Sequence, residues 1–170
     1  MNTQEHTKII EQLAEWLTNN NKLMSVAESC TGGWVAKVLT DLAGSSAWFE
    51  RGFVTYSNRA KHEMLGVAES TLHKYGAVSE ETVSEMAVGA LTNSHANFSL
   101  SISGIAGPGG GSEDKPVGLV WFAWAERTNE GEKVILSEQQ IFAGDRDAVR
   151  YQALVHALTR LLNLMQTQEQ

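Results

Sequence analysis

The feature that constrains the fold most is a turn of small polar residues between two mainly apolar segments. Residues 23–27 have the pattern of a buried strand, and residues 34–42 carry apolar side chains at helical spacing. The turn between them starts at Glu28 and has the sequence Glu-Ser-Cys-Thr-Gly-Gly. A strand followed directly by a helix indicates an α/β fold. Because the N–H groups that begin a helix lack helical partners, such a turn is expected to favour developing negative charge.

Similar patterns along the rest of the chain predict further strands and helices. Helical spacing predicts helices over residues 4–19 and 146–165. Ser57 and Asn58 are expected to cap a helix that ends at Leu65, Gly76 to end a helix over residues 70–75, and Ser79 to cap a longer helix. Strands are expected at 47–56, 98–103, 117–126 and 134–142. The last two strands form a hairpin, so at least one strand is antiparallel. The sequence therefore predicts a three-layer α/β sandwich with a mixed, mostly parallel sheet of five to six strands.

Composition bounds the class of protein. With 170 residues, of which 42% are hydrophobic and 19% charged, the chain is expected to form a single domain over residues 1–170. No apolar run approaches the ~18 residues of a membrane span, and the N-terminus does not resemble a secretory signal, so we expect a cytoplasmic protein without membrane contact.

The charge and the residue composition argue against nucleic-acid binding and metal binding. The net charge of -7 and the scattered lysines and arginines argue against nucleic-acid binding. One cysteine and five scattered histidines form no zinc-binding pattern, so neither a metal site nor an intrachain disulfide is expected. An anionic small molecule remains a possible ligand if a local pocket reverses the overall sign.

The turn after the first strand offers three side chains for chemistry. Ser29 is a nucleophile or a helix N-cap, and Thr31 suits the cap better. Cys30 is a rival nucleophile, although a single cysteine is more often a small buried residue. Lys61 becomes a base if burial lowers its pKa, although most lysines are exposed. No spacing singles out one of the histidines as the base: His6, His62, His73, His95 and His156.

Two later segments suggest an anion site. The glycine-rich loop 107–111 allows close approach to a phosphate, but it matches no phosphate-binding motif, and its glycine content is more typical of a flexible surface loop. Asp145 is expected to cap the last helix, whose dipole opposes the positive charge of Arg146. A bound phosphate would compensate that charge, and so would Asp145 and Asp147.

Taken together, five segments resemble the CinA C-terminal family, and the resemblance extends from about Ile9 to Leu162. The motifs in chain order are Ala27–Gly33, Thr55–Asn58 with Lys61, Gly76–Ser79, Ser103–Pro108 and Gly144–Arg146. The resemblance implies hydrolysis of the carboxamide of nicotinamide mononucleotide to nicotinic acid mononucleotide and ammonia, as a step of pyridine-nucleotide recycling. It implies no metal and no organic cofactor.

The resemblance also implies roles for single residues. Ser29 would be the nucleophile and Lys61 the general base, with Tyr56 beside them in the catalytic group. The N–H groups from Cys30 to Gly33 would stabilise the oxyanion, and Arg146 would meet the phosphate. The residues implied to contact the substrate are Cys30, Thr31, Gly32, Gly33, Asn58, Ser103, Gly104, Gly107, Pro108 and Arg146.

Other functions are compatible with the same residues. A non-catalytic nucleotide-binding or regulatory module would keep the pocket without turnover, and an amidase for another phosphorylated substrate would keep the catalytic pair. We also expect a homodimer, in which exposed sides of Trp48 or Trp121 take part.

Overall fold

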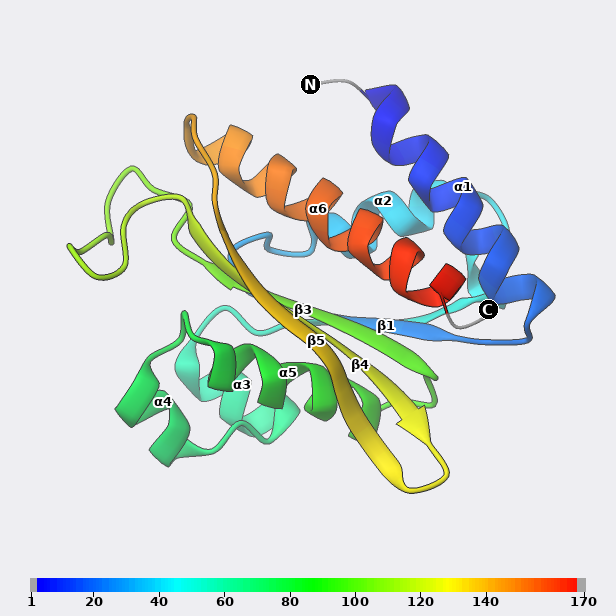
Figure 1. Cartoon of the computed structure of the whole chain (residues 1–170), viewed down its shortest axis with the longest axis horizontal. Helices are drawn as coiled ribbons and strands as arrows, with labels where there is room; N and C mark the ends of the chain where they lie inside the picture. The colour runs from blue at the N-terminus through cyan, green and yellow to red at the C-terminus, as the bar shows by residue number, and fades with distance from the viewer. Residues whose placement is uncertain (1–2, 168–170) are drawn as a thin grey trace.

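The computed structural model describes residues 3–167, which build one mixed β-sheet with helices on both faces (Figure 1). The strand order is β2-β1-β3-β4-β5. The strands are β1 (Met24–Glu28), β2 (Phe49–Val54), β3 (Phe98–Gly104), β4 (Leu119–Thr128) and β5 (Gly131–Ile141). β1 pairs in parallel with β2 and β3, whereas β4 is antiparallel to both β3 and β5. The mixed five-stranded sheet predicted from the sequence is therefore confirmed, and β4 is the strand that runs against the others.

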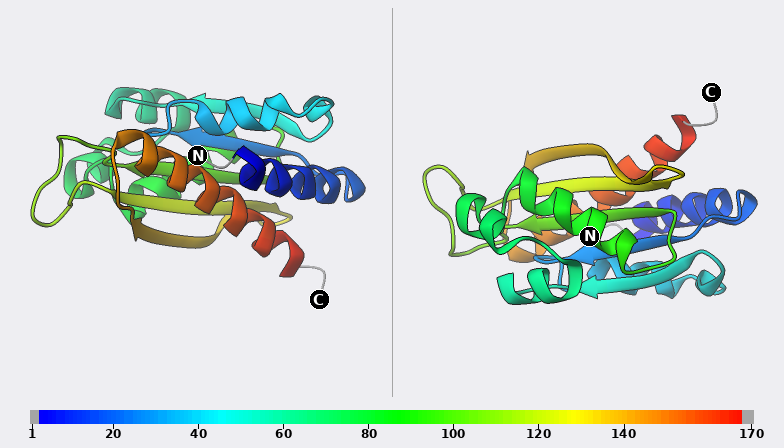
Figure 2. Two further views of the ribbon diagram at one scale, coloured as in Figure 1. Left: turned by 90° about the horizontal axis from the view of Figure 1, so that it is seen from above. Right: turned by 90° about the horizontal axis from the view of Figure 1, so that it is seen from below.

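Helices cover the sheet in two layers (Figures 1 and 2). One layer contains α1 (Thr3–Asn19), α2 (Trp34–Asp41) and α6 (Arg146–Thr167), and the other contains α3 (Asn58–Leu65), α4 (Glu69–Tyr75) and α5 (Glu80–Thr92). The first layer closes the larger hydrophobic core, which joins these helices to β1, β3 and β4. This arrangement confirms the predicted α/β/α sandwich. Within residues 3–167, no helix has both the length and the apolar character needed to cross a membrane.

The predicted helix starts agree with the structure except at the motif turn. Ser57 Oγ accepts a hydrogen bond from Ala60 N–H, and Ser79 Oγ accepts one from Thr82 N–H, so both serines cap helices. Asp145 likewise accepts from the N–H of Ala148 at 2.9 Å. The expected exposure of Trp48 is wrong, because its side chain packs in the larger core and only 2% of the residue is exposed.

Strand β3 is buried on both faces, although its sequence alternates between serine and apolar residues. Its serines face α5, where Ser99 Oγ donates to the carbonyl of Ala87 at 2.7 Å and Ser101 Oγ donates to that of Val83 at 2.6 Å. These bonds satisfy hydroxyls that would otherwise be costly to bury. The small serine side chains therefore hold α5 close against the sheet.

The packing of α5 against α3 depends on Gly89. An added Cβ at Gly89 would overlap the backbone carbonyl group of Leu65, at the end of α3. This close approach requires glycine, and it fixes the position of the helix that carries Lys61.

The variant Gly89→Ala tests this packing. Alanine normally stabilises a helix interior by about 1 kcal/mol relative to glycine. Here the added methyl group has no space, so we expect the free energy of unfolding to fall by about 1–3 kcal/mol in urea denaturation. Gly109→Ala is the control, because open space surrounds that position. Equal or greater stability of Gly89→Ala would contradict the packing described.

Candidate active site

Ser29 and Lys61 lie in direct contact. Ser29 follows β1, and Lys61 lies on α3, which follows the neighbouring parallel strand β2, so both residues reach the same edge of the sheet. Lys61 Nζ is 3.0 Å from Ser29 Oγ and donates a hydrogen bond to the carbonyl of Thr55 at 2.8 Å. Lys61 is 1% exposed and Ser29 is 8% exposed. The two residues that the sequence suggested as base and nucleophile are thus brought together.

The surroundings of Lys61 suit a general base. Burial disfavours the charged amine and lowers the pKa of Lys61 from 10.5 to about 8. At neutral pH about a tenth of such an amine is uncharged, against less than about one in a thousand for an ordinary lysine. Lys61 therefore has a lone pair available to accept the proton of Ser29.

A buried carboxylate, that of Glu28, caps helix α2. Its Oε2 accepts hydrogen bonds from the N–H groups of Gly33 and Val35, both at 3.0 Å, and its Oε1 accepts from that of Ala36 at 2.8 Å. Thr31 was expected to be the cap, and this expectation is wrong. Its Oγ1 is buried and has no hydrogen-bond partner among residues 3–167. The carboxylate prevails because it satisfies three backbone donors at once.

These bonds also narrow the set of N–H groups that face a ligand. Gly32 N–H donates to the carbonyl of Ser29 at 3.0 Å, and Gly33 N–H is held by Glu28. The expectation that all four N–H groups from Cys30 to Gly33 stabilise an oxyanion is therefore wrong for the two glycines. In the described part of the chain, the N–H groups of Cys30 and Thr31 donate to no other residue.

The thiol of Cys30 does not compete with Ser29. Cys30 is 6% exposed and belongs to the hydrophobic core. Burial raises the pKa of the Cys30 thiol to about 12, so the thiolate is scarce at neutral pH.

Arg146 joins two other predicted site segments. Its Nη1 donates to the carbonyl of Gly107 at 2.8 Å, and its Nη2 donates to the hydroxyl of Tyr56 at 3.1 Å. Tyr56 is 62% exposed. The carboxyl ends of β1 and β3, the loop after β3 and the start of α6 all lie at the left of the sheet in Figure 1. A cation and an exposed aromatic ring thus share this edge with Ser29 and Lys61.

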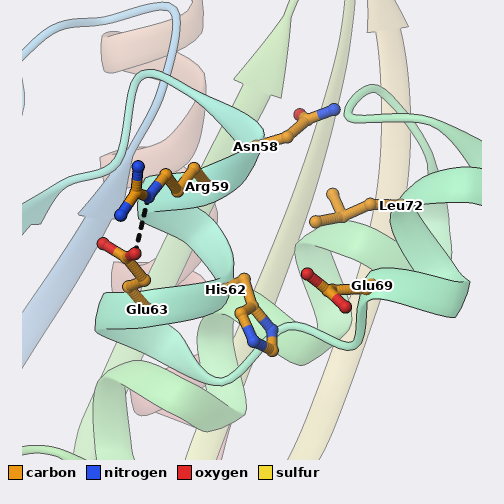
Figure 3. A pocket seen from close by; sticks show the side chains of 6 residues that line it. All are labelled: Asn58, Arg59, His62, Glu63, Glu69 and Leu72. Atoms are coloured by element: carbon orange, nitrogen blue, oxygen red, sulfur yellow. Dashed lines mark hydrogen bonds and ion pairs between the residues drawn. The ribbon is translucent and has the colours of Figure 1, made fainter.

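Three residues that were expected to contact the substrate have neighbours other than Ser29 and Lys61. Ser103 is buried and donates to the carbonyl of Ala77 at 2.7 Å, and an added Cβ at Gly104 would lie 2.7 Å from Val120 Cγ2. Asn58 lines a pocket of about 420 Å³ between α3 and α4. Figure 3 shows its side chain there with the other lining residues: Arg59, His62, Glu63, Glu69 and Leu72. None of the hydrogen bonds of the described residues joins Asn58 to Ser29 or Lys61.

Arg150 is a site residue that the sequence reasoning missed. Its Nε donates to the carbonyl of Cys30 at 3.0 Å and its Nη2 to that of Thr31 at 3.2 Å. The signal for it was present, because Arg150 follows Arg146 by four residues and such residues share one face of a helix.

The structure places no histidine against Ser29 and no cluster of metal ligands in residues 3–167. No histidine ring in residues 3–167 hydrogen-bonds Ser29, and His156, for example, is 2.6 Å from Glu138 Oε1. The same residues contain no group of three or more His, Cys, Asp or Glu side chains placed to hold a metal ion.

Residues 6–165 match the family model described as the CinA C-terminal domain, and the chain belongs to that family. The resemblance seen in the sequence motifs is thereby confirmed. A relative named Nicotinamide-nucleotide amidohydrolase PncC, from Escherichia coli (strain K12), is 57% identical over 161 residues, which cover 95% of each protein. A relative of the same name from Pseudomonas putida is 48% identical over 158 residues, which cover 93% of this chain and 96% of that protein.

Solved structures share the fold. The competence/damage inducible protein CihA from Agrobacterium tumefaciens superposes with a TM-score of 0.89 at 44% identity, over 94% of this chain and 95% of that one. A Competence-Damaged Protein (CinA) Superfamily Protein from Klebsiella pneumoniae gives a TM-score of 0.87 at 37% identity, over 94% and 97% of the two chains.

The burial of Cys30 predicts an unreactive thiol. In the folded protein at pH 8, we expect iodoacetamide to modify Cys30 on the order of a thousandfold more slowly than in the urea-unfolded protein, because little thiolate forms. Mass spectrometry of samples quenched over time measures both rates. Equal rates in the two states would contradict the described environment of Cys30.

Proposed function

We propose that this chain is a nicotinamide-nucleotide amidohydrolase, which converts nicotinamide mononucleotide and water to nicotinic acid mononucleotide and ammonia. The observation that carries the proposal is the contact of a buried Lys61 amine with the hydroxyl of Ser29. A binding module has no need of a buried lysine whose pKa is lowered to about 8 beside a serine. The names of the relatives at 57% and 48% identity support the same reaction.

In the proposed first half-reaction, Ser29 Oγ attacks the amide carbon while Lys61 Nζ accepts the serine proton. The carbonyl oxygen of the substrate becomes an oxyanion, which accepts hydrogen bonds from backbone N–H groups of the turn. Lys61 then donates the proton to the amide nitrogen, the carbon–nitrogen bond breaks, and ammonia leaves. Ser29 is left as an ester of the nicotinoyl group, and Lys61 is neutral again.

In the proposed second half-reaction, water replaces Ser29. Lys61 accepts a proton from the water as its oxygen attacks the ester carbon, and it returns that proton to Ser29 Oγ as the ester bond breaks. The product is the carboxylate of nicotinic acid mononucleotide. One lysine thus serves as base and acid in both halves, since a pKa near neutrality permits either role.

Binding of the mononucleotide is assigned to the edge of the sheet around Arg146. The guanidinium of Arg146 can form paired hydrogen bonds with a phosphate, and the exposed Tyr56 ring offers a surface to the pyridinium ring. Phosphate binding far from the amide would contribute energy that free nicotinamide lacks. The remaining substrate contacts implied by the sequence, from Asn58, Ser103, Gly104 and Pro108, stay predictions.

The domain organisation, pathway, cellular location and oligomeric state of the proposed enzyme also stay predictions. We expect a single domain over residues 1–170, a place in pyridine-nucleotide recycling in the cytoplasm, and a homodimer. The burial of Trp48 removes it from the expected dimer surface and leaves Trp121, which is partly exposed.

Ser29→Ala and Lys61→Ala test the proposed mechanism. Each variant lacks one partner of the proton transfer, so we expect kcat for ammonia release from nicotinamide mononucleotide to fall at least about a thousandfold. Lys37→Ala is the control for a removed lysine, because Lys37 is exposed and its ion pair in the described residues is with Asp41 in the next turn. Circular dichroism confirms that each variant is folded.

Full activity of the folded Ser29→Ala protein would refute the nucleophile assignment. Calorimetric binding of the mononucleotide by the natural sequence without any turnover would identify a regulatory module instead. A panel of pyridine nucleotides and related amides, followed by mass spectrometry, would reveal a different preferred substrate.

A further inference from the structure

We propose that Arg150 is a positioning residue for the amidase reaction, which holds the turn after Ser29 so that the N–H groups of Cys30 and Thr31 form the oxyanion hole. The inference rests on the proposed function, because it takes Ser29 as the nucleophile. It goes beyond that function by naming the donors and the residue that keeps them in place.

The start of helix α2 does not supply these donors. Glu28 occupies the N–H groups of Gly33, Val35 and Ala36, and its negative charge offsets the partial positive charge of the helix N-terminus. The turn therefore needs another source of positive potential where an oxyanion develops. Within residues 3–167, Arg150 is the cation that hydrogen-bonds the carbonyl groups of this turn, those of Cys30 and Thr31.

The direction of the peptide groups supports this role. A carbonyl and the N–H of the same trans peptide point in opposite directions. The carbonyl of Cys30 is directed at Arg150, so the N–H of Thr31 in that peptide points away from the guanidinium. Donation by a charged group to the carbonyl also polarises the peptide and strengthens its N–H as a donor. Arg150 thus orients the N–H of Thr31 and strengthens it as a donor.

Arg150 is itself held firmly. Its guanidinium carbon lies 5.2 Å from the centre of the Trp34 ring, and Nη1 lies 3.5 Å from Asp147 Oδ1. Its side chain is 25% exposed, so water screens its charge less than that of a free surface arginine. A planar guanidinium that is always charged can reach both carbonyls at once, which an ammonium group cannot do as well.

The position of Arg150 predicts which kinetic constant it affects. It contacts the backbone of the turn, whereas Arg146, one helical turn earlier, reaches Gly107 and Tyr56. Arg150 therefore acts on the transition state through the turn, and its loss is expected to lower kcat rather than raise KM.

The test compares Arg150→Met and Arg150→Lys with the natural sequence. For Arg150→Met we expect kcat with nicotinamide mononucleotide to fall about a hundredfold, with KM changed less than about threefold. Arg150→Lys should recover part of the loss, because an ammonium group can still donate to one carbonyl. Arg160→Met is the control, since Arg160 lies on the same helix and pairs with Glu138 away from the turn.

A second readout separates the oxyanion hole from general stability. In the aldehyde analogue of the mononucleotide, with a formyl group in place of the carboxamide, Ser29 Oγ adds to the aldehyde carbon while its proton moves to Lys61. The resulting hemiacetal oxyanion should bind about a hundredfold more weakly to Arg150→Met, whereas the affinity for the carboxylate product, whose charge is shared between two oxygens, should fall much less. Arg150→Lys gives the same comparison if Arg150→Met does not fold.

Two outcomes overturn the inference in different ways. If the natural sequence releases ammonia and binds the aldehyde, and the Arg150 variants match it, Arg150 has no positioning role. Equal losses of aldehyde and product affinity would indicate a merely structural role and overturn it as well. If the natural sequence neither turns over the mononucleotide nor binds the aldehyde, the proposed function fails and this inference fails with it.

Discussion

The contact of Lys61 Nζ with Ser29 Oγ, at 3.0 Å, is the interaction on which the rest of the site depends. Parallel pairing of β1 and β2 brings both residues to one edge of the sheet. Burial then keeps a fraction of the amine uncharged, and the carbonyl of Thr55 fixes its position. Gly89 lets α5 approach α3, the helix that carries Lys61, more closely than a larger residue would allow. Sheet topology and helix packing thus bring together the proposed catalytic pair, which includes no histidine.

Two charges of opposite sign act on the turn between β1 and α2. The buried carboxylate of Glu28 binds the first N–H groups of α2, which keeps this charge satisfied within the fold. The guanidinium of Arg150 binds two carbonyls of the same turn. The turn is therefore bonded through both its N–H and its carbonyl groups, and in the described residues the N–H groups of Cys30 and Thr31 donate to no other residue. Rigidity of this kind is what a preorganised catalytic site requires.

Local patterns predicted the elements of the fold well and singled out Ser29 as a candidate nucleophile. Period-two alternation located β3, serine caps located α3 and α5, and the strand–turn–helix succession placed Ser29 at the carboxyl end of a strand. What the residues alone left open was whether Lys61 is buried. That depends on contacts between segments far apart in the chain, and the family resemblance, not the spacing, favoured it.

One error has a local origin, and two come from contacts between distant segments. The choice of Thr31 as cap followed the general preference for threonine at this position. In the structure, the carboxylate of Glu28 accepts the hydrogen bonds of the helix start instead. The exposure expected for Trp48 failed because the segment before β2 packs its indole into the core. Arg150 was missed because its partners lie about 120 residues earlier in the chain. The four-residue spacing from Arg146 places Arg150 on the same helix face, but it does not show which distant segment Arg150 contacts.

Direct titration of the Lys61 amine tests the central claim most directly. Nuclear magnetic resonance of protein labelled with ¹⁵N at the lysine side chains, assigned with Lys61→Ala, follows the Nζ signal against pH. Burial disfavours the charged form, so Lys61 should lose its proton at about pH 8, while exposed lysines titrate near their ordinary value of about 10.4. A Lys61 amine that remains fully charged at pH 10 would contradict its role as the base for Ser29.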